Sequence, residues 1–248
     1  MLKSVLSLAF LLIASPLGLA AEPPAPTGGE FYDVVAPPHP TADPTKVEVI
    51  EFFWYGCPHC FHFEPHIKTW LKTKPANVVF IRQPAIFNAH WAAHAKAFFT
   101  AEALGVLDKV HDDLYDSIQN KKETLETEDD LAKFFAAHGV KEDDFHTAYK
   151  SFAVDAKMRH AEPLAASYGV DGTPALIING KYRVGAAKAK SFDKMIETAN
   201  TLVAHELAVL STQTQKPTPA EASKPAEAAK PAEPAKPAKQ KAHAKSTQ

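Results

Sequence analysis

The sequence predicts an α/β protein whose strands are interrupted by an all-helical insertion. β-Branched and aromatic residues dominate 46–55 and 77–83, and the stretch between them has the apolar spacing of a helix. Helical periods then run from residue 90 to about 168, β character returns at 175–184, and an amphipathic helix follows at 192–210. This alternation indicates a sheet covered by helices, with a helical block inserted between its strands.

The first 20 residues have the pattern of a secretory signal peptide. Lys3 provides the charged start, an apolar run continues through Ile13, and small residues precede the expected cleavage after Ala20. The apolar run is too short to span a bilayer, and no cysteine follows it for lipid attachment. We therefore expect the mature protein to be exported to a compartment in which disulfides persist.

The net charge of −2 conceals two parts of opposite sign. Residues 211–248 hold seven Lys and three Glu, whereas residues 21–210 carry a net charge of −7. Because an acidic body has no electrostatic footprint for nucleic acid, we expect no nucleic-acid partner.

Residues 211–248 are expected to form a disordered Lys/Pro/Ala-rich tail. Lys-Pro-Ala recurs every six residues at Lys224, Lys230 and Lys236, and the segment has almost no apolar bulk to bury. A solvated tail is the simplest interpretation. Weak electrostatic tethering to an anionic envelope surface is the alternative.

The strand at 46–55 is apolar on both faces, which indicates a buried central position. The helix that follows it is long enough to connect it in parallel with the strand at 77–83, and Pro65 predicts a kink in that helix. The Pro-rich N-terminal arm, residues 21–45, includes a short stretch at 31–35 that we expect to pair as an edge strand.

The helical insertion is predicted to span 88–167. We expect helices over 91–104, 106–118, 131–137 and 144–168, the last of them broken near Phe152 or Pro163. After the insertion, Asn179-Gly180 predicts a type I′ turn between two short antiparallel strands.

Cys57 and Cys60 are the only cysteines, and they lie where the first strand gives way to the helix. Two cysteines at i and i+3 can close a small disulfide across the first helical turn. Free N–H groups and the positive end of the helix dipole favour a thiolate at Cys57, so we expect Cys57 to be the exposed nucleophile with a lowered pKa. Cys60, one turn further, is expected to be the shielded, resolving thiol.

The residues between the cysteines fit this chemistry. Pro58 suits the first helical turn, where a missing N–H costs nothing, and His59 adds an imidazole that can donate to a thiolate or carry positive charge beside it. Stabilising the thiolate stabilises the reduced form, and each pKa unit corresponds to about 1.4 kcal/mol, or about 30 mV in a two-electron couple. The motif therefore favours donating disulfides over reducing them.

Glu51 lies within the strongly apolar strand before the cysteines. One interpretation is a carboxylate that faces outward from the sheet. The other is a carboxylate buried near Cys60 that helps to move protons during thiol exchange.

These motifs together resemble the DsbA family of the thioredoxin superfamily. The resemblance rests on Glu51-Phe52-Phe53, on Cys57-Pro58-His59-Cys60-Phe61 with Phe63-Glu64, and on Gly172-Thr173-Pro174-Ala175, which matches the superfamily's cis-proline loop. It covers roughly residues 28–208. It implies a thioredoxin-like domain formed by 46–87 and 168–208, with the helical insertion between the two parts.

The resemblance also implies roles for individual residues. The Cys57–Cys60 disulfide would be donated to unfolded, newly exported proteins that carry free cysteines. Thr173, before a cis Pro174, would pair with the client backbone, and Glu51 would be the family's buried carboxylate, with Arg82 as the basic residue near it. Reoxidation would come from a quinone-linked membrane oxidase of the DsbB type. No cofactor is expected, and the protein is expected to be a monomer.

Three alternatives remain open at this point. The cysteines could be half of a zinc site completed by His62 and His66, although helical geometry places both histidines away from the pair. A disulfide isomerase or reductase of the same superfamily is a nearer alternative. A non-catalytic periplasmic chaperone is the alternative from a different class.

Overall fold

The central strand of the sheet is β2 (Val47–Phe53), as its two apolar faces predict. In the computed structural model, which describes residues 26–214, β2 pairs in parallel with β3 (Val78–Pro84) and antiparallel with β4 (Ala175–Ile178). β5 (Tyr182–Gly185) extends the sheet, and its order is β1-β5-β4-β2-β3. The predicted signal peptide lies outside the described residues.

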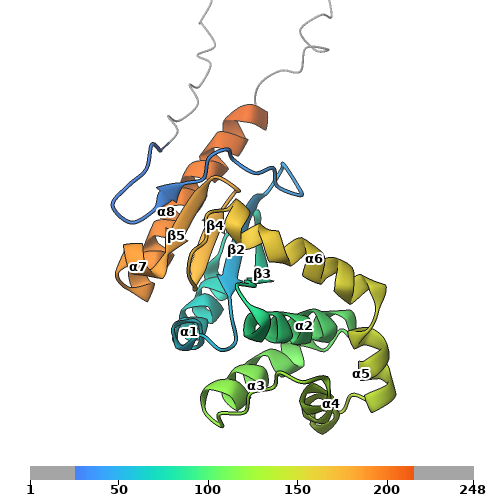
Figure 1. The fold of residues 1–248 in the computed structure, drawn as a ribbon. Coiled ribbons are helices and arrows are strands. Elements are labelled where there is room, and N and C mark those ends of the chain that lie inside the picture. The colour runs from blue at the N-terminus through green and yellow to red at the C-terminus, as the bar shows by residue number, and fades with distance from the viewer. Residues whose placement is uncertain (1–25, 215–248) are drawn as a thin grey trace, which may run out of the picture. The chain divides into compact units, whose positions relative to one another are not determined.

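Strand alternation sends the side chains of β2 into two cores, one on each face of the sheet. Val47 and Val49 pack with α1 (Pro58–Thr73) and α8 (Phe192–Thr214), whereas Ile50 and Phe52 pack on the opposite face with the end of α6 (Phe152–Ser167). Figure 1 shows α1 and α8 on one face and α6 on the other.

The N-terminal arm adds the edge strand β1 (Asp33–Val34), which pairs antiparallel with β5. This strand is shorter than the predicted stretch 31–35. Asp33 forms ion pairs with Arg183 and Lys188, so charge as well as backbone pairing holds the arm to the edge.

The hairpin between β4 and β5 turns at Asn179-Gly180, as predicted. Both residues have positive φ, 50° at Asn179 and 66° at Gly180, which is the requirement of a type I′ turn. A side chain at Gly180 would meet the backbone oxygen of His39 at 2.1 Å, so the arm passes directly over this turn.

The block between β3 and β4 is helical, as predicted, and consists of α2 (Ala89–Ala103), α3 (Leu107–Gln119), α4 (Glu128–Ala137), α5 (Glu142–Tyr149) and α6. The expected break near Phe152 is confirmed, because α5 and α6 are separate helices and Ser151 caps α6. Pro163 lies inside α6 and does not end it, and Pro65 likewise lies inside α1.

The closing helix is longer than predicted. After the short α7 (Ala186–Ala189), α8 continues to Thr214, so the first four residues assigned to the tail are helical. The remainder of the tail lies outside the described residues. Within 26–214, no helix is both long and apolar enough to cross a membrane.

Candidate active site

The cysteine pair lies at the carboxyl end of the central strand, where the chain leaves β2 and enters α1. Cys57 is the N-cap of α1, with extended backbone angles, and Pro58 is the first helical residue. The backbone N–H of Cys57 donates to Trp54 O at 3.0 Å, which closes the loop between strand and helix. Both cysteines are free thiols in this structure.

The two thiols have opposite acidities. A hydrogen bond from the Cys60 side chain lowers the pKa of Cys57 to about 5, and the backbone N–H groups of Cys60 and His59 act in the same direction. Burial opposes this lowering but does not outweigh it. Burial raises the pKa of Cys60 well above its usual range, and the donated hydrogen bond adds to that effect. The pKa of Cys57 is therefore shifted in the direction expected from the sequence, with the Cys60 side chain as the largest cause and the backbone N–H groups of the helix start as smaller ones.

Cys57 is less exposed than the sequence predicts, because only 8% of its surface is accessible. The loop before β4 covers it: Cys57 Sγ lies 3.4 Å from the backbone oxygen of Thr173. The position of each cysteine in the helix predicts which one faces outward. It cannot predict that this side will be covered by a loop 116 residues further along the chain.

The covering loop contains the predicted cis-proline. The Thr173–Pro174 peptide bond is cis, and Pro174 leads directly into β4. Because β4 pairs with β2, the sheet itself carries this loop to the cysteines.

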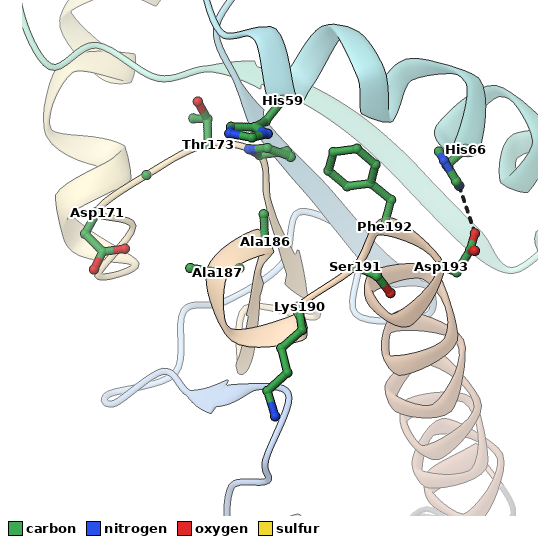
Figure 2. Close-up of a pocket in the computed structure, with 13 residues that line it drawn as sticks. His59, His66, Asp171, Thr173, Ala186, Ala187, Lys190, Ser191, Phe192 and Asp193 are labelled. Carbon is green, nitrogen blue, oxygen red and sulfur yellow. Dashed lines mark ion pairs between the residues drawn. The ribbon is translucent and has the colours of Figure 1, made fainter.

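The imidazole of His59 points toward a cavity of about 630 Å³ beside the cysteine pair, which we call the groove (Figure 2). The ring makes no hydrogen bond with any residue in 26–214, whereas the backbone N–H of His59 lowers the pKa of Cys57. The groove is lined by His59, His66, Thr173, Pro174 and residues of α7 and the start of α8.

Glu51 is buried, with 1% of its surface exposed, which excludes the outward-facing carboxylate. Strand alternation places it on the face of β2 that α1 covers. The pKa of Glu51 is raised to about 8: burial is the largest cause, the nearby Glu64 acts in the same direction, and Arg82 opposes the rise. Arg82 Nε lies 3.6 Å from Glu51 Oε2, as expected for the neighbouring basic residue.

Glu64 also belongs to this buried group; the sequence motif contains it but assigned it no role at the site. It is one turn beyond Cys60 on the buried face of α1, and it forms a close ion pair with Arg82. Burial raises the pKa of Glu64, but the hydrogen bond from His111 and the charge of Arg82 outweigh burial, so the net shift is downward. Its i, i+4 spacing from Cys60 could have identified it from the sequence, because residues four apart lie on the same face of a helix.

His111 and Tyr55 complete the group from the helical insertion and the active-site loop. Tyr55 Oη and His111 Nδ1 are 2.8 Å apart, and His111 Nε2 lies 3.5 Å from Glu64 Oε1. His111 comes from α3, and local sequence gives only its place on a buried helical face beside Leu114 and Tyr115.

The cysteines and the two histidines that would form a zinc site do not come together in the structure. His62 is exposed on α1, and His66 forms an ion pair of 3.1 Å with Asp193 of α8. No cluster of three or more metal-ligating side chains occurs among the described residues.

Thiol–disulfide exchange needs an acidic thiol beside a protected one, and this site supplies Cys57 and the buried Cys60 next to a cis-proline loop. The fold and site define a thioredoxin-like thiol:disulfide oxidoreductase. Comparison with known proteins narrows the class further. Residues 79–197 match the family of the DSBA-like thioredoxin domain.

Similar proteins agree with this assignment over most of the chain. The thiol:disulfide interchange protein DsbA of Pseudomonas aeruginosa (strain PAO1) is 38% identical over 207 residues, which cover 84% of this chain and 98% of the relative. DsbA of Azotobacter vinelandii is 41% identical over 194 residues, or 77% of this chain and 90% of the relative. The chain belongs to the DsbA family.

Solved structures show the same relationship. The crystal structure of Pseudomonas aeruginosa DsbA superposes with a TM-score of 0.70 at 38% identity, and the match covers 73% of this chain and 94% of that chain. The oxidoreductase DsbA from Xylella fastidiosa gives a TM-score of 0.69 at 31% identity, covering 74% and 98% of the two chains. The thioredoxin-like fold implied by the sequence motifs is thereby confirmed.

Proposed function

We propose that this protein donates a Cys57–Cys60 disulfide to newly exported proteins in the periplasm. The observation that carries the proposal is the split between the two thiols: the pKa of Cys57 is lowered to about 5, and that of Cys60 is raised well above its usual range. A thiolate at Cys57 stabilises the reduced form of the pair, so the disulfide is readily given away.

The reaction is two successive thiol–disulfide exchanges. A client thiolate attacks Cys57 Sγ, a client–Cys57 disulfide forms, and the Cys57–Cys60 bond breaks with its electron pair on Cys60, which then takes up a proton. A second client thiolate attacks the client sulfur of the mixed disulfide and releases Cys57 as a thiolate. The client gains one disulfide, and the enzyme holds two reduced cysteines.

Leaving-group chemistry supports Cys57 as the sulfur that is attacked and later released. A sulfur of low pKa leaves faster in the second step, and Cys57 has the lower pKa of the pair. Pro58 and His59 complete the catalytic motif, and the backbone N–H of His59 acts on the Cys57 thiolate.

Glu51 and Arg82 have supporting roles in the proposal. Cys60 must gain a proton when it is expelled and lose one when the enzyme is reoxidised. A buried carboxyl with a pKa of about 8 is able to exchange protons at neutral pH, and Arg82 modulates that pKa. Thr173 and Pro174 would position the client, with the backbone of Thr173 pairing with an extended client segment.

The partners follow from the family. DsbA proteins act on exported proteins by thiol–disulfide exchange. For this chain we propose a signal peptide cleaved after Ala20, a monomeric mature protein, and reoxidation by a quinone-linked membrane oxidase of the DsbB type. We propose the domain boundaries expected from the sequence, with the helical part at 88–167, except that the closing helix α8 continues to Thr214.

Equilibration of the Cys57–Cys60 pair with glutathione, measured across pH, tests the proposal. We expect glutathione to reduce the disulfide readily and the thiolate absorbance of Cys57 to titrate near pH 5. A Cys57 thiol that ionises near the value of free cysteine, together with a disulfide that resists glutathione, would instead select the reductase alternative. Retention of activity after Cys57→Ser would select the chaperone.

A further inference from the structure

The groove beside the cysteines carries carboxylates at both of its ends. Figure 2 shows Asp171 at one end, Asp193 at the other, and His59 and Thr173 between them. Both carboxylates are exposed, with 90% of the Asp193 side chain accessible. Asp171 forms no ion pair with any residue in 26–214. The lining between them is mainly small or apolar, as at Pro174, Ala186 and Phe192.

The lysines near the groove are already paired. Lys190, the only lysine that lines it, donates to Glu30 of the N-terminal arm at 2.7 Å. Lys194 is 2.5 Å from Glu197, and both lysines lie over the ring of Phe31. The N-terminal arm therefore keeps the positive charges of Lys190 and Lys194 at the outer rim of the groove. The carboxylates of Asp171 and Asp193 line the groove itself.

Two other features bear on the charge of the groove. His66 faces Asp193 at 3.1 Å and offsets its charge only when the imidazole is protonated. The start of α8 is the positive end of a helix dipole, and Asp193 lies in its first turn, where a carboxylate counters that dipole. At alkaline pH, where His66 does not offset Asp193, the net charge of the groove is therefore negative.

From this arrangement we propose that the groove selects client segments with a Lys or Arg side chain within a few residues of the reacting cysteine. The inference rests on the proposed function and specifies the client class for the same site. A client paired with the backbone of Thr173 runs as an extended chain, which advances about 3.3 Å per residue. We expect the client segment on either side of its cysteine to run along the groove, toward Asp171 on one side and Asp193 on the other.

Matched peptides test the selection. Each would contain one reduced cysteine pair and carry either Arg, Gln or Glu at the positions one and two residues from the first cysteine on both sides, because side chains of an extended chain alternate between its two faces. The oxidised enzyme would be mixed with each peptide at pH 8, where histidine side chains are normally neutral, and the second-order rate constant of oxidation measured at low and high salt. We expect the Arg peptide to react about threefold to tenfold faster than the Glu peptide at low salt, and the ratio to approach one in high salt.

Three variants locate the effect. Asp171→Asn and Asp193→Asn each remove one groove carboxylate, and Glu30→Gln releases Lys190. Each should lower the Arg-to-Glu rate ratio about twofold or more at low salt. Asp143→Asn is the matched control, because it removes one exposed carboxylate from α5, which does not line the groove. It should leave the ratio unchanged.

The outcomes separate this inference from the proposed function. Equal rates for all three peptides, or an equal drop in the ratio with Asp143→Asn, would overturn charge selection by the groove while leaving disulfide donation intact. An enzyme that oxidises none of the peptides, the uncharged Gln peptide included, would contradict disulfide donation itself.

Discussion

The hydroxyl of Tyr55 and Nδ1 of His111 lie 2.8 Å apart, and this bond ties the loop before Cys57 to helix α3 of the helical insertion. A second bond joins the same two parts, from Gln119 Nε2 to the backbone oxygen of Tyr55 at 2.7 Å. Trp54, the preceding residue, stacks on Trp91 of α2 with ring centroids 4.3 Å apart. The helical insertion thus holds the segment that leads into the nucleophile.

Tyr55→Phe tests the strength of this connection. The substitution keeps the ring but leaves a buried imidazole nitrogen of His111 without its partner, so we expect a loss of about 1–3 kcal/mol in the free energy of unfolding. Urea denaturation of the reduced protein measures it. Tyr149→Phe removes a half-buried hydroxyl that has no hydrogen bond with a described residue, and it should cost less than about 0.5 kcal/mol. Equal losses in the two variants would refute the role of the bond.

Cys60 is the main hydrogen-bond donor to the Cys57 thiolate, so replacing it should raise the pKa of Cys57. Cys60→Ala removes the donor, whereas Cys60→Ser keeps a hydroxyl in nearly the same place. We expect the pKa to rise in the order wild type, serine variant, alanine variant. Thiolate absorbance followed against pH gives all three values, and an alanine variant that titrates near pH 5 would contradict this assignment.

The reduced protein should lose stability relative to the oxidised protein as pH falls from about 8.5 to about 5. The pKa of Cys57 is lower in the folded state than the roughly 8.5 of a free thiol. A depressed pKa contributes stability that is fully present above the unfolded pKa and is lost as pH falls through the folded one. Because the disulfide form has no thiolate, the difference between the two forms isolates this effect. Denaturation of both forms at several pH values measures it.

Glu51→Gln is expected to stabilise the protein at pH 8 and to have little effect near pH 4. The folded pKa of Glu51 is raised to about 8, so its penalty is absent below the unfolded value of about 4.3 and grows as pH rises toward 8. The gain at pH 8 should be on the order of 1–3 kcal/mol. Glu162→Gln, at an exposed carboxyl of α6, is the control and should show no such dependence on pH.

Arg82→Met removes the cation that lies between two buried carboxyl groups. Glu51, with its pKa raised to about 8, is largely protonated at pH 7, so the substitution mainly leaves the buried Glu64 carboxylate without its cation. We expect a cost of about 3–5 kcal/mol at pH 7, and less at pH 4, where Glu64 can take up a proton. Arg159→Met, at an exposed arginine of α6, provides the comparison. A loss of the same size at both pH values would show that lost packing, and not charge, is responsible.

Much of the site was predictable because it depends on residues close together in the chain. Cys57, Pro58 and Cys60 span one helical turn, so their place at a helix start follows from a strand pattern that ends at a glycine. The Asn179-Gly180 turn and the buried position of β2 follow from equally local rules. Pro174 as a cis residue, by contrast, came from the family motif, since isomer state cannot be read from local composition.

What the sequence by itself determined is the order of strands and helices, the position of the cysteine pair and the direction of the Cys57 pKa, because backbone geometry and nearest neighbours set each of these. Only the tertiary structure decided that Thr173 covers Cys57 and that Glu30 forms an ion pair with Lys190. It also decided that Glu64 and His111 lie in one buried group with Glu51 and Arg82. Each of those contacts joins segments that come together only after the cores on the two faces of the sheet have packed. Their geometry therefore depends on how whole elements fit and not on any local pattern.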